Sequence, residues 1–350
     1  MKMKKTLFLI SFLFAQFLAF AQGVEFVEEN IDQVLATAKK TNKYVFIDFY
    51  TSWCGPCKMM DKQIFPQQKV GEYFDSKFVS MKVNAEKEGV DLAKKYGIKA
   101  YPTFVILDKS GELQHVFAGG ILDADKFITA VDNSFDPKKA YGVLKKKYEA
   151  GDRSITLQSN YLQALISTHT ENPQPLVDSF YSGLSKEQKI SKETLFVYEL
   201  FAPLDSEKAK FFEVNRSQFR KVADAAKVDS ILRSKYEQYF GKIVKGYAPE
   251  TTVADLDKMK KHVASLGIKD LKSLPVYESG AKLKLTNNGK EEFLNSLKTT
   301  APKLTENEKD IMLYMVLPGL KTVLTDQEKQ NLLAMVSNED VKGYIERSVK

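Results

Sequence analysis

Two cysteines lie three positions apart in the segment Trp53-Cys54-Gly55-Pro56-Cys57-Lys58, and the 350-residue chain has no others. A disulfide between them would close a very short loop. Such a bond removes little entropy from the unfolded chain and therefore stabilises a fold only slightly. We expect the pair to serve chemistry instead, with Cys54 and Cys57 alternating between two thiols and one disulfide.

The cysteine segment follows an apolar, strand-like run and opens a predicted helix. The first N–H groups of a helix lack partners and the dipole is positive there, so a thiolate at Cys54 would be stabilised and its pKa lowered. Pro56 suits a first turn, where its missing N–H costs nothing. We predict that Cys54 is the nucleophile, that the more buried Cys57 resolves the mixed disulfide, and that Gly55 lets a client backbone approach.

Other uses of a Cys-x-x-Cys motif are disfavoured. A zinc site takes four ligands, but there is no second cysteine pair and the histidines (His115, His169, His262) are scattered. The chain also lacks a flavin or nicotinamide fingerprint. We therefore expect no metal and no bound cofactor, and we expect a separate electron donor such as a membrane thiol carrier.

The residues around the cysteines alternate between helical and strand-like patterns from 24 to 136. Strands are expected at 44–50, 78–83, 103–107 and 113–117. Helices are expected from Asn30 as N-cap, from Pro56 with a break at Pro66, at 90–96, and from Asp123 as N-cap. The order α-β-α-β-α-β-β-α predicts an α/β domain with a central sheet.

Asp48 lies in the middle of the first long strand, among Val45, Phe46, Ile47 and Phe49. Burial penalises the charged form of a carboxyl group, so its pKa should rise. A carboxyl group that titrates near neutral pH could take the proton from Cys57 as this residue attacks.

Three separated motifs resemble thioredoxin in their order: Asp48-Phe49-Tyr50, the 53–58 cysteine segment, and Tyr101-Pro102-Thr103. The resemblance covers about a third of the chain and implies a thioredoxin fold, a central mixed sheet flanked by helices. It implies that Tyr101–Pro102 is a cis peptide facing the cysteines and that Lys82 lies near Asp48 as a second catalytic residue. It also implies a set of client-binding residues: Trp53, Gly55, Pro56, Tyr101 and Pro102.

A finer resemblance concerns residues 57–61 and 64–70, which are similar to the periplasmic thioredoxin-like domain of membrane disulfide-reducing electron carriers. Those domains have an acidic residue at the position of Asp61. The dipeptide Gly55-Pro56 departs from that subfamily and is the one found in cytosolic thioredoxin. It implies a bias towards reduction.

The N-terminus has the pattern of a secretory signal peptide over residues 1–21. Three lysines precede an apolar run from Thr6 to Phe20, and Ala19-Phe20-Ala21 places small residues where a signal peptidase reads. The run is shorter than the roughly 20 residues that span a bilayer, and no later segment is apolar enough to cross a membrane. We expect a protein exported to the periplasm or secreted, with no membrane span after cleavage.

Beyond Asp136-Pro137 the pattern is helical, which predicts a second, all-α domain of unknown function at 137–350 after a thioredoxin-like domain at 22–136. Its basic excess is mixed with acids, so a nucleic-acid partner is not expected. The leading hypothesis is an exported thiol–disulfide oxidoreductase that reduces or exchanges disulfides of extracytoplasmic proteins. The alternative is a non-catalytic binding or assembly protein whose helical domain recruits partners.

Overall fold

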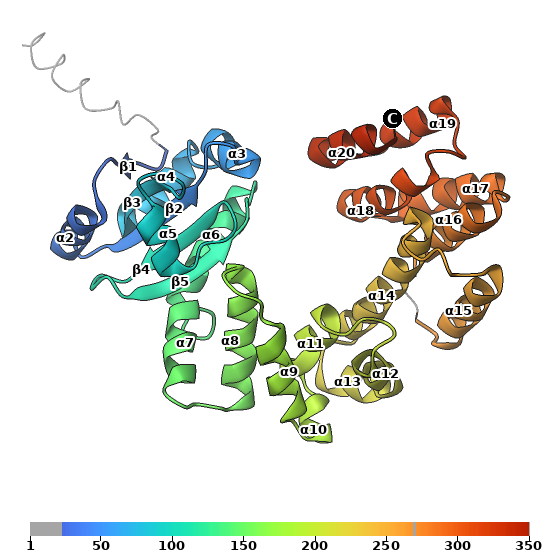
Figure 1. Cartoon of the computed structure of the whole chain (residues 1–350), viewed down its shortest axis with the longest axis horizontal. Coiled ribbons are helices and arrows are strands. Elements are labelled where there is room, and N and C mark those ends of the chain that lie inside the picture. The colour runs from blue at the N-terminus through green and yellow to red at the C-terminus, as the bar shows by residue number, and fades with distance from the viewer. Residues whose placement is uncertain (1–22, 269–270, 350) are drawn as a thin grey trace, which may run out of the picture. The chain divides into compact units, whose positions relative to one another are not determined.

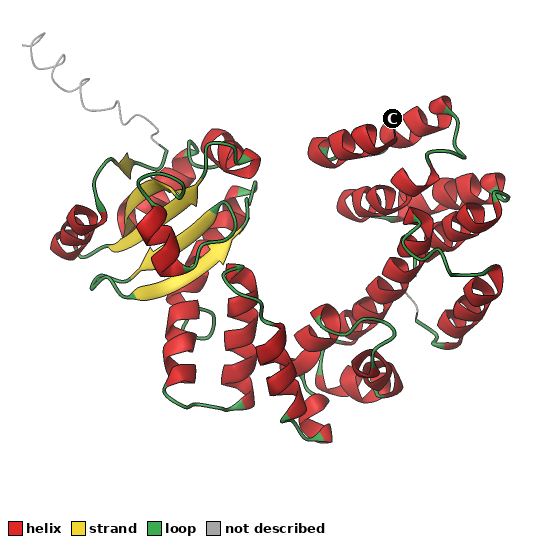
Figure 2. Cartoon of the chain, viewed as in Figure 1, coloured by secondary structure: helices red, strands yellow, loops and turns green. Residues whose placement is uncertain are grey.

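The computed structural model describes residues 23–268 and 271–349 (Figures 1 and 2). The expected signal peptide at residues 1–21 lies outside these residues. The chain divides into two compact units, the first ending at Leu184 and the second beginning at Ser185. Each unit is described by itself below.

The first unit is built on a five-stranded mixed sheet in the order β1-β3-β2-β4-β5. Strands β1, β3 and β2 run parallel, and β2, β4 and β5 are antiparallel neighbours. The strands are β1 (Phe26–Val27), β2 (Tyr44–Tyr50), β3 (Phe78–Asn84), β4 (Thr103–Leu107) and β5 (Leu113–Ala118). The four longer strands confirm the sequence prediction, whereas the two-residue β1 was not predicted because so short a strand has no periodicity to detect.

Within the described residues, eight α-helices complete the first unit, and all but α9 lie around the sheet or pack on its edge. They are α2 (Ile31–Thr41), α3 (Gly55–Gln63), α4 (Gln68–Lys77), α5 (Val90–Tyr96), α6 (Ala124–Asp132), α7 (Tyr141–Glu149), α8 (Ile155–Thr168) and α9 (Gln174–Ser182). Asn30 and Asp123 accept backbone hydrogen bonds as N-caps of α2 and α6, as predicted. The predicted break at Pro66 is confirmed by the gap between α3 and α4. The sheet with its flanking helices is therefore the predicted thioredoxin fold.

The aromatic core lies between one face of the sheet and the helices α3, α4 and α6. The Phe46 ring of β2 contacts Phe74 of α4 edge-on at 4.7 Å between centroids, and Phe74 stacks on Phe127 of α6 at 5.7 Å. Aromatic pairs of this kind add to the free energy of burial. This core fixes α3 against β2, and the cysteine segment begins in the loop between them and continues into the first turn of α3.

Helix α7 closes the outer edge of the sheet at β5. The N–H of Tyr141 donates to Nδ1 of the buried His115, at 3.0 Å. Lys146 forms an ion pair with Glu112 at 3.0 Å. The sequence places the end of the α/β domain at residue 136, but the compact unit continues to Leu184 because α7 and α8 pack on β5. Covering a strand edge removes unpaired backbone groups from solvent.

Gly142 permits this close packing, and we expect Gly142→Ala to lower the free energy of unfolding of the first unit by about 3 kcal/mol. A Cβ at this position would lie 2.0 Å from the carbonyl oxygen of Leu113, which belongs to the backbone and cannot rotate away. Guanidinium unfolding followed by fluorescence of Trp53, the single tryptophan, reports on this unit.

The matched control for this measurement is Gly183→Ala, whose added Cβ would lie at an ordinary 3.6 Å from its nearest neighbour. Equal stability of the two variants would mean that α7 is not seated on the edge of β5.

The second unit is helical throughout its described residues, as predicted. Its α-helices are α10 (Lys186–Lys189), α11 (Leu195–Leu200), α12 (Glu207–Val214), α13 (Arg216–Val222), α14 (Ala225–Lys245), α15 (Val253–Ser265), α16 (Leu274–Thr286), α17 (Lys290–Thr300), α18 (Glu306–Val316), α19 (Asp326–Leu333) and α20 (Glu339–Val349). Capping boxes at Ser185, Thr305 and Thr325 begin α10, α18 and α19. Among the helices in the described residues, none is long and apolar enough to span a membrane.

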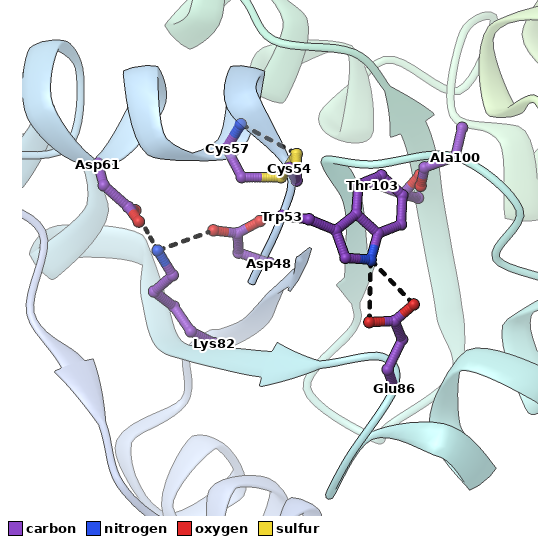
Figure 3. Close-up of a disulfide and its surroundings, with 9 residues drawn as sticks. All are labelled: Asp48, Trp53, Cys54, Cys57, Asp61, Lys82, Glu86, Ala100 and Thr103. Atoms are coloured by element: carbon purple, nitrogen blue, oxygen red, sulfur yellow. Dashed lines mark hydrogen bonds and ion pairs between the residues drawn. A yellow bond between two sulfur atoms is a disulfide. The ribbon is translucent and has the colours of Figure 1, made fainter. Parts of the chain in front are cut away.

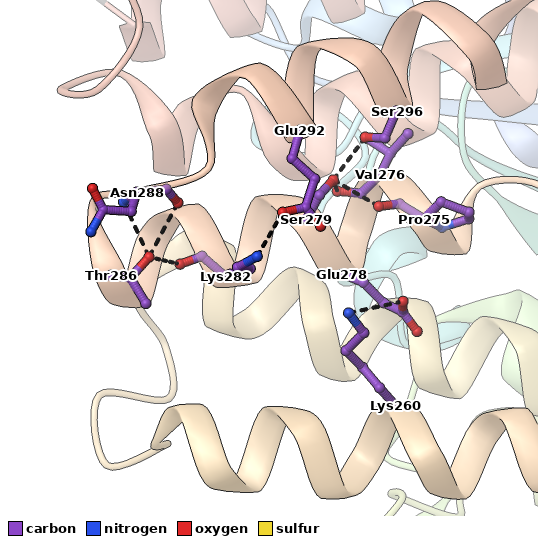
Figure 4. Close-up of polar contacts among 10 residues, drawn as sticks. All are labelled: Lys260, Pro275, Val276, Glu278, Ser279, Lys282, Thr286, Asn288, Glu292 and Ser296. Atoms are coloured by element: carbon purple, nitrogen blue, oxygen red, sulfur yellow. Dashed lines mark hydrogen bonds and ion pairs between the residues drawn. The ribbon is translucent and has the colours of Figure 1, made fainter.

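Polar contacts join neighbouring helices of this unit (Figure 4). Between α16 and α17, the hydroxyl groups of Ser279 and Ser296 lie 2.7 Å apart and Lys282 pairs with Glu292 at 2.7 Å. Such small buried hydroxyls let two helices approach closely while their polar atoms stay paired.

Candidate functional site

Cys54 and Cys57 form a disulfide at the first turn of α3, with their Cα atoms 5.4 Å apart. Cys54 is the N-cap residue, and its Sγ accepts a hydrogen bond from the N–H of Cys57 at 3.1 Å. Pro56 occupies the first turn, as predicted. Both cysteines are 2% exposed, so the predicted difference in burial between them is absent from the disulfide form. The observed N–H donor would stabilise a thiolate at Cys54 after reduction.

Asp48 lies on β2 with 1% of its surface exposed, and its Oδ1 has no hydrogen-bond partner among the described residues. Alternate residues of a strand share a face, so Asp48 is on the side of Phe46 that α3 covers. Burial raises the pKa of Asp48 to about 7, although the ammonium group of Lys82 opposes this change. The expected burial and raised pKa are therefore both present.

Lys82 stands beside Asp48 because the two residues are paired in the parallel register of β2 and β3. Its Nζ lies 3.4 Å from Oδ2 of Asp48 and also forms an ion pair with Asp61 of α3 (Figure 3). The same Nζ lies 5.1 Å from the centre of the Tyr50 ring. The ammonium group of Lys82 is thus shared between the buried carboxyl group of Asp48 and the half-exposed one of Asp61. This sharing weakens the attraction between Lys82 and Asp48.

We expect Asp61→Asn to lower the pKa of Asp48 from about 7, because the negative charge of Asp61 contributes to raising it. Removing that charge also leaves Lys82 with a single acidic partner. The measurement is a ¹³C NMR titration of the Asp48 carboxyl group. Asp75→Asn, at an exposed position of α4, is the control. An unchanged or higher pKa in Asp61→Asn would contradict the shared-cation arrangement.

Trp53 forms an exposed wall beside the disulfide. Its side chain is 64% exposed, yet its indole Nε1 donates to both carboxylate oxygens of Glu86 at 3.0 Å (Figure 3). The ring also meets Tyr101 edge-on at 5.8 Å. A large apolar surface held in place next to the reactive sulfurs is suited to contact with a client protein.

Two loops approach the cysteine segment from β4 and β5. The Tyr101–Pro102 peptide is cis, the isomer that the resemblance implies, and Thr103 Oγ1 donates to the carbonyl of Ala100 at 2.8 Å in the same loop. After β5 the chain turns at Gly119, with φ of 107°, and a Cβ on Gly120 would lie 3.1 Å from Cβ of Pro56. A Cβ on Gly55 would meet nothing within 4 Å, so the surface at Gly55, between the two cysteines, is open.

The structure thus brings the predicted site residues together around the start of α3: Asp48, Trp53, Cys54, Gly55, Pro56, Cys57, Lys82, Tyr101 and Pro102. Two further residues were not predicted as part of the site. Asp61 lies one helical turn after Cys57, and that spacing could have revealed it. Glu86 follows β3 with no local pattern that signals its contact with Trp53.

The site has the composition of a dithiol–disulfide centre. It combines a disulfide at a helix start, a buried carboxyl group that titrates near neutral pH, and an exposed aromatic wall. Within residues 23–268 and 271–349, no group of three or more histidine, cysteine or acidic side chains is arranged to hold a metal ion.

Comparison with known proteins places residues 31–134 in the family described as thioredoxin-like domain. The chain is 36% identical over 101 residues to chloroplastic thioredoxin Y of Oryza sativa, covering 29% of this chain and 56% of that protein. It is 37% identical over 92 residues to thioredoxin-T of Drosophila melanogaster, covering 26% and 54%. The chain therefore spans little more than half the length of these relatives. A solved structure of a proposed disulphide isomerase from Bacteroides thetaiotaomicron is 39% identical, over 34% of this chain and 98% of that one, with a TM-score of 0.31.

Proposed function

Since residues 31–134 form a thioredoxin-like domain, we propose that this protein is a thiol–disulfide oxidoreductase acting on protein clients through Cys54 and Cys57. One observation carries the proposal. The cysteines form a disulfide at the N-terminus of α3, and a backbone N–H points at Sγ of Cys54. A helix start is where a cysteine gains thiolate character, and only the thiolate attacks disulfides.

The proposed reaction begins with the reduced protein. The Cys54 thiolate attacks one sulfur of a client disulfide, forms a mixed disulfide and releases the other client sulfur as a thiolate. Cys57 then loses its proton to Asp48, attacks Sγ of Cys54 and releases the second client sulfur. The client gains two electrons, and the protein returns to the disulfide that the structure contains. Lys82 supports the charged form of Asp48 during the proton transfer.

Client binding is assigned to the surface around the cysteines. Trp53 supplies an apolar wall, and the exposed Gly55 and Pro56 offer a surface for the client between the two cysteines. Tyr101 and Pro102 offer backbone at the edge of the site to an extended client segment.

The proposal is tested by the reduction of insulin disulfides, with dithiothreitol as the electron source. The purified protein should accelerate the reaction well above dithiothreitol alone, and a variant with both cysteines replaced by serine should not. No acceleration by the wild-type protein would overturn the proposal. The direction of electron flow follows from the redox potential of the pair: a value near about −270 mV favours reduction of clients, and one near about −120 mV favours oxidation.

We further infer that a separate donor reduces the pair again, and that this donor is a membrane thiol carrier. The inference follows from two electrons leaving the protein in each cycle and from the absence of a flavin or nicotinamide fingerprint in the sequence. Cells that lack every such carrier should accumulate the disulfide form, as measured by trapping free thiols with an alkylating reagent. A pair that stays reduced in those cells would refute the inference.

Export of the protein is also part of the proposal, and its clients would then be extracytoplasmic. It is supported by the lysines, the apolar run and the small residues within positions 1–21. N-terminal sequencing of the protein isolated from its native cells should give Gln22 as the first residue. A protein that retains Met1 would argue against cleavage.

A further inference from the structure

A groove of about 490 Å³ lies in the first unit, beside the edge of the sheet where α8 packs. It is bounded by β5, the loop after β5, α6 and α8. Its apolar and polar lining residues include Phe117, Ile121, Ala130, Asn160, Gln163 and Ser167. Half of these come from α8, a helix outside the 31–134 segment that the thioredoxin-like domain occupies.

The groove adjoins the redox centre. Two of its residues, Ala118 and Ile121, directly flank Gly119-Gly120, and Gly120 is the residue whose added Cβ would lie 3.1 Å from Pro56. The segment after α8 also lies near the loop before the cis peptide, because a Cβ on Gly97 would be 3.6 Å from Cβ of Thr170. A chain that crosses the disulfide beside Gly120 would therefore enter this groove next.

The lining of the groove matches the chemistry of an extended peptide. The half-buried Ile121 and Ala130 offer an apolar surface for one side chain. The amide of Asn160, which makes no hydrogen bond to the described part of the chain, can pair with both the N–H and the C=O of a peptide backbone. Because side-chain amides supply donor and acceptor together, they suit backbone recognition independent of sequence.

Two lysines at the rim of the groove favour a bound segment that contains an acidic residue. Lys138 and Lys139 line the groove and both are exposed. Lys139 lies 3.9 Å from Asp136, whereas Lys138 has no acidic partner within ion-pair distance among the described residues. An acidic side chain of a bound peptide would therefore meet positive charge at this end of the groove.

We propose that this groove binds an extended segment of the client polypeptide next to its disulfide, and that it favours an apolar residue accompanied by an acidic one. The proposal rests on the proposed function and adds to it a determinant of client choice. The helical hairpin of α7 and α8 would then be part of the client-binding surface, and the protein would discriminate among disulfides by the sequence that flanks them.

The test compares two synthetic disulfide-linked peptide substrates. The short one has a single residue on each side of each cysteine, and the long one adds eight residues on both sides that contain leucine and glutamate. The reduced protein is mixed with each, and the second-order rate is followed by Trp53 fluorescence. The wild-type protein should reduce the long substrate about tenfold faster than the short one, which corresponds to one or two favourable contacts.

Variants assign this advantage to the groove. Gln163 is exposed, so Gln163→Phe should fill the groove without disturbing the core and without adding a second tryptophan to the Trp53 signal, and the long and short substrates should then react at equal rates. Lys138→Glu should reduce the advantage. Lys147→Glu, which makes the same change of charge at an exposed position of α7 outside the groove lining, should preserve it.

Three results would overturn the proposal: equal rates for the two substrates with the wild-type protein, an advantage that survives in Gln163→Phe, or a change of oligomeric state in Gln163→Phe that assigns the groove to a second copy of the chain. Failure to reduce either substrate would instead refute the proposed function, so the two failures are distinguishable.

Discussion

Cys54→Ser is expected to lose at least about 10³-fold in the rate of client reduction, whereas Cys57→Ser should react once and then stop. In the first variant the nucleophile is gone, because a serine hydroxyl at the N-cap is not ionised near neutral pH. In the second variant Cys54 still attacks, but no thiol is present to resolve the mixed disulfide. Insulin reduction measures the first result, and non-reducing gels with mass spectrometry measure the second.

The two variants are matched controls for each other, since each exchanges one sulfur for one oxygen in the same turn of α3. The structure gives a reason for their different roles. The N–H of Cys57 donates to Sγ of Cys54 at 3.1 Å, so it is position 54 that has a donor for a thiolate. This backbone donor remains in both variants, which therefore differ only in which sulfur is present. If Cys54→Ser accumulated the mixed disulfide and Cys57→Ser did not, the assigned roles of the two cysteines would be reversed.

The sequence alone predicted those features of the site that depend on residues close together in the chain. The cysteine spacing, the strand before it and Pro56 after it predicted a cysteine pair at a helix start, and the structure has this arrangement. The apolar neighbours of Asp48 predicted its burial and its raised pKa. Each of these predictions depends on residues within about one helical turn or one strand, where periodicity and capping chemistry are informative.

The remaining contacts join residues that are far apart in the chain. Trp53 and Glu86 are 33 positions apart, and His115 and Tyr141 are 26 apart. The helical pattern beyond residue 137 predicted helices there but did not indicate which surface the buried face of α7 would meet. The contact with β5 requires a glycine at 142 and a histidine acceptor at 115. Neither residue type by itself indicates a contact between a helix and a strand. For the same reason, the end of the first compact unit at Leu184 could not be deduced from the change of pattern at residue 136.

The burial of Asp48 has a measurable consequence for stability: Asp48→Asn should stabilise the protein at pH 8 and change little near pH 4. The pKa of this carboxyl group is about 7 in the folded protein against 3.8 when free of the fold. As the pH rises from about 4 to 7, the unfolded chain loses this proton while the folded chain keeps it, so folding becomes less favourable by about 1.4 kcal/mol per pH unit. Asparagine avoids that cost, and the gain should level off above pH 7 at about 4 kcal/mol.

The measurement is guanidinium unfolding between about pH 4 and 8, followed by Trp53 fluorescence. His115 makes the comparison with the wild type necessary. Burial lowers the pKa of His115 to about 4, so this residue makes the fold less stable as the pH falls from about 6.5, opposite to the effect of Asp48. The contribution of His115 cancels in the difference between Asp48→Asn and the wild type. Asp75→Asn, at an exposed aspartate, should show no such pH-dependent gain. A gain that is independent of pH would mean that folding does not raise the pKa of Asp48. A loss at pH 8 would mean that the ion pair with Lys82 outweighs the burial of Asp48.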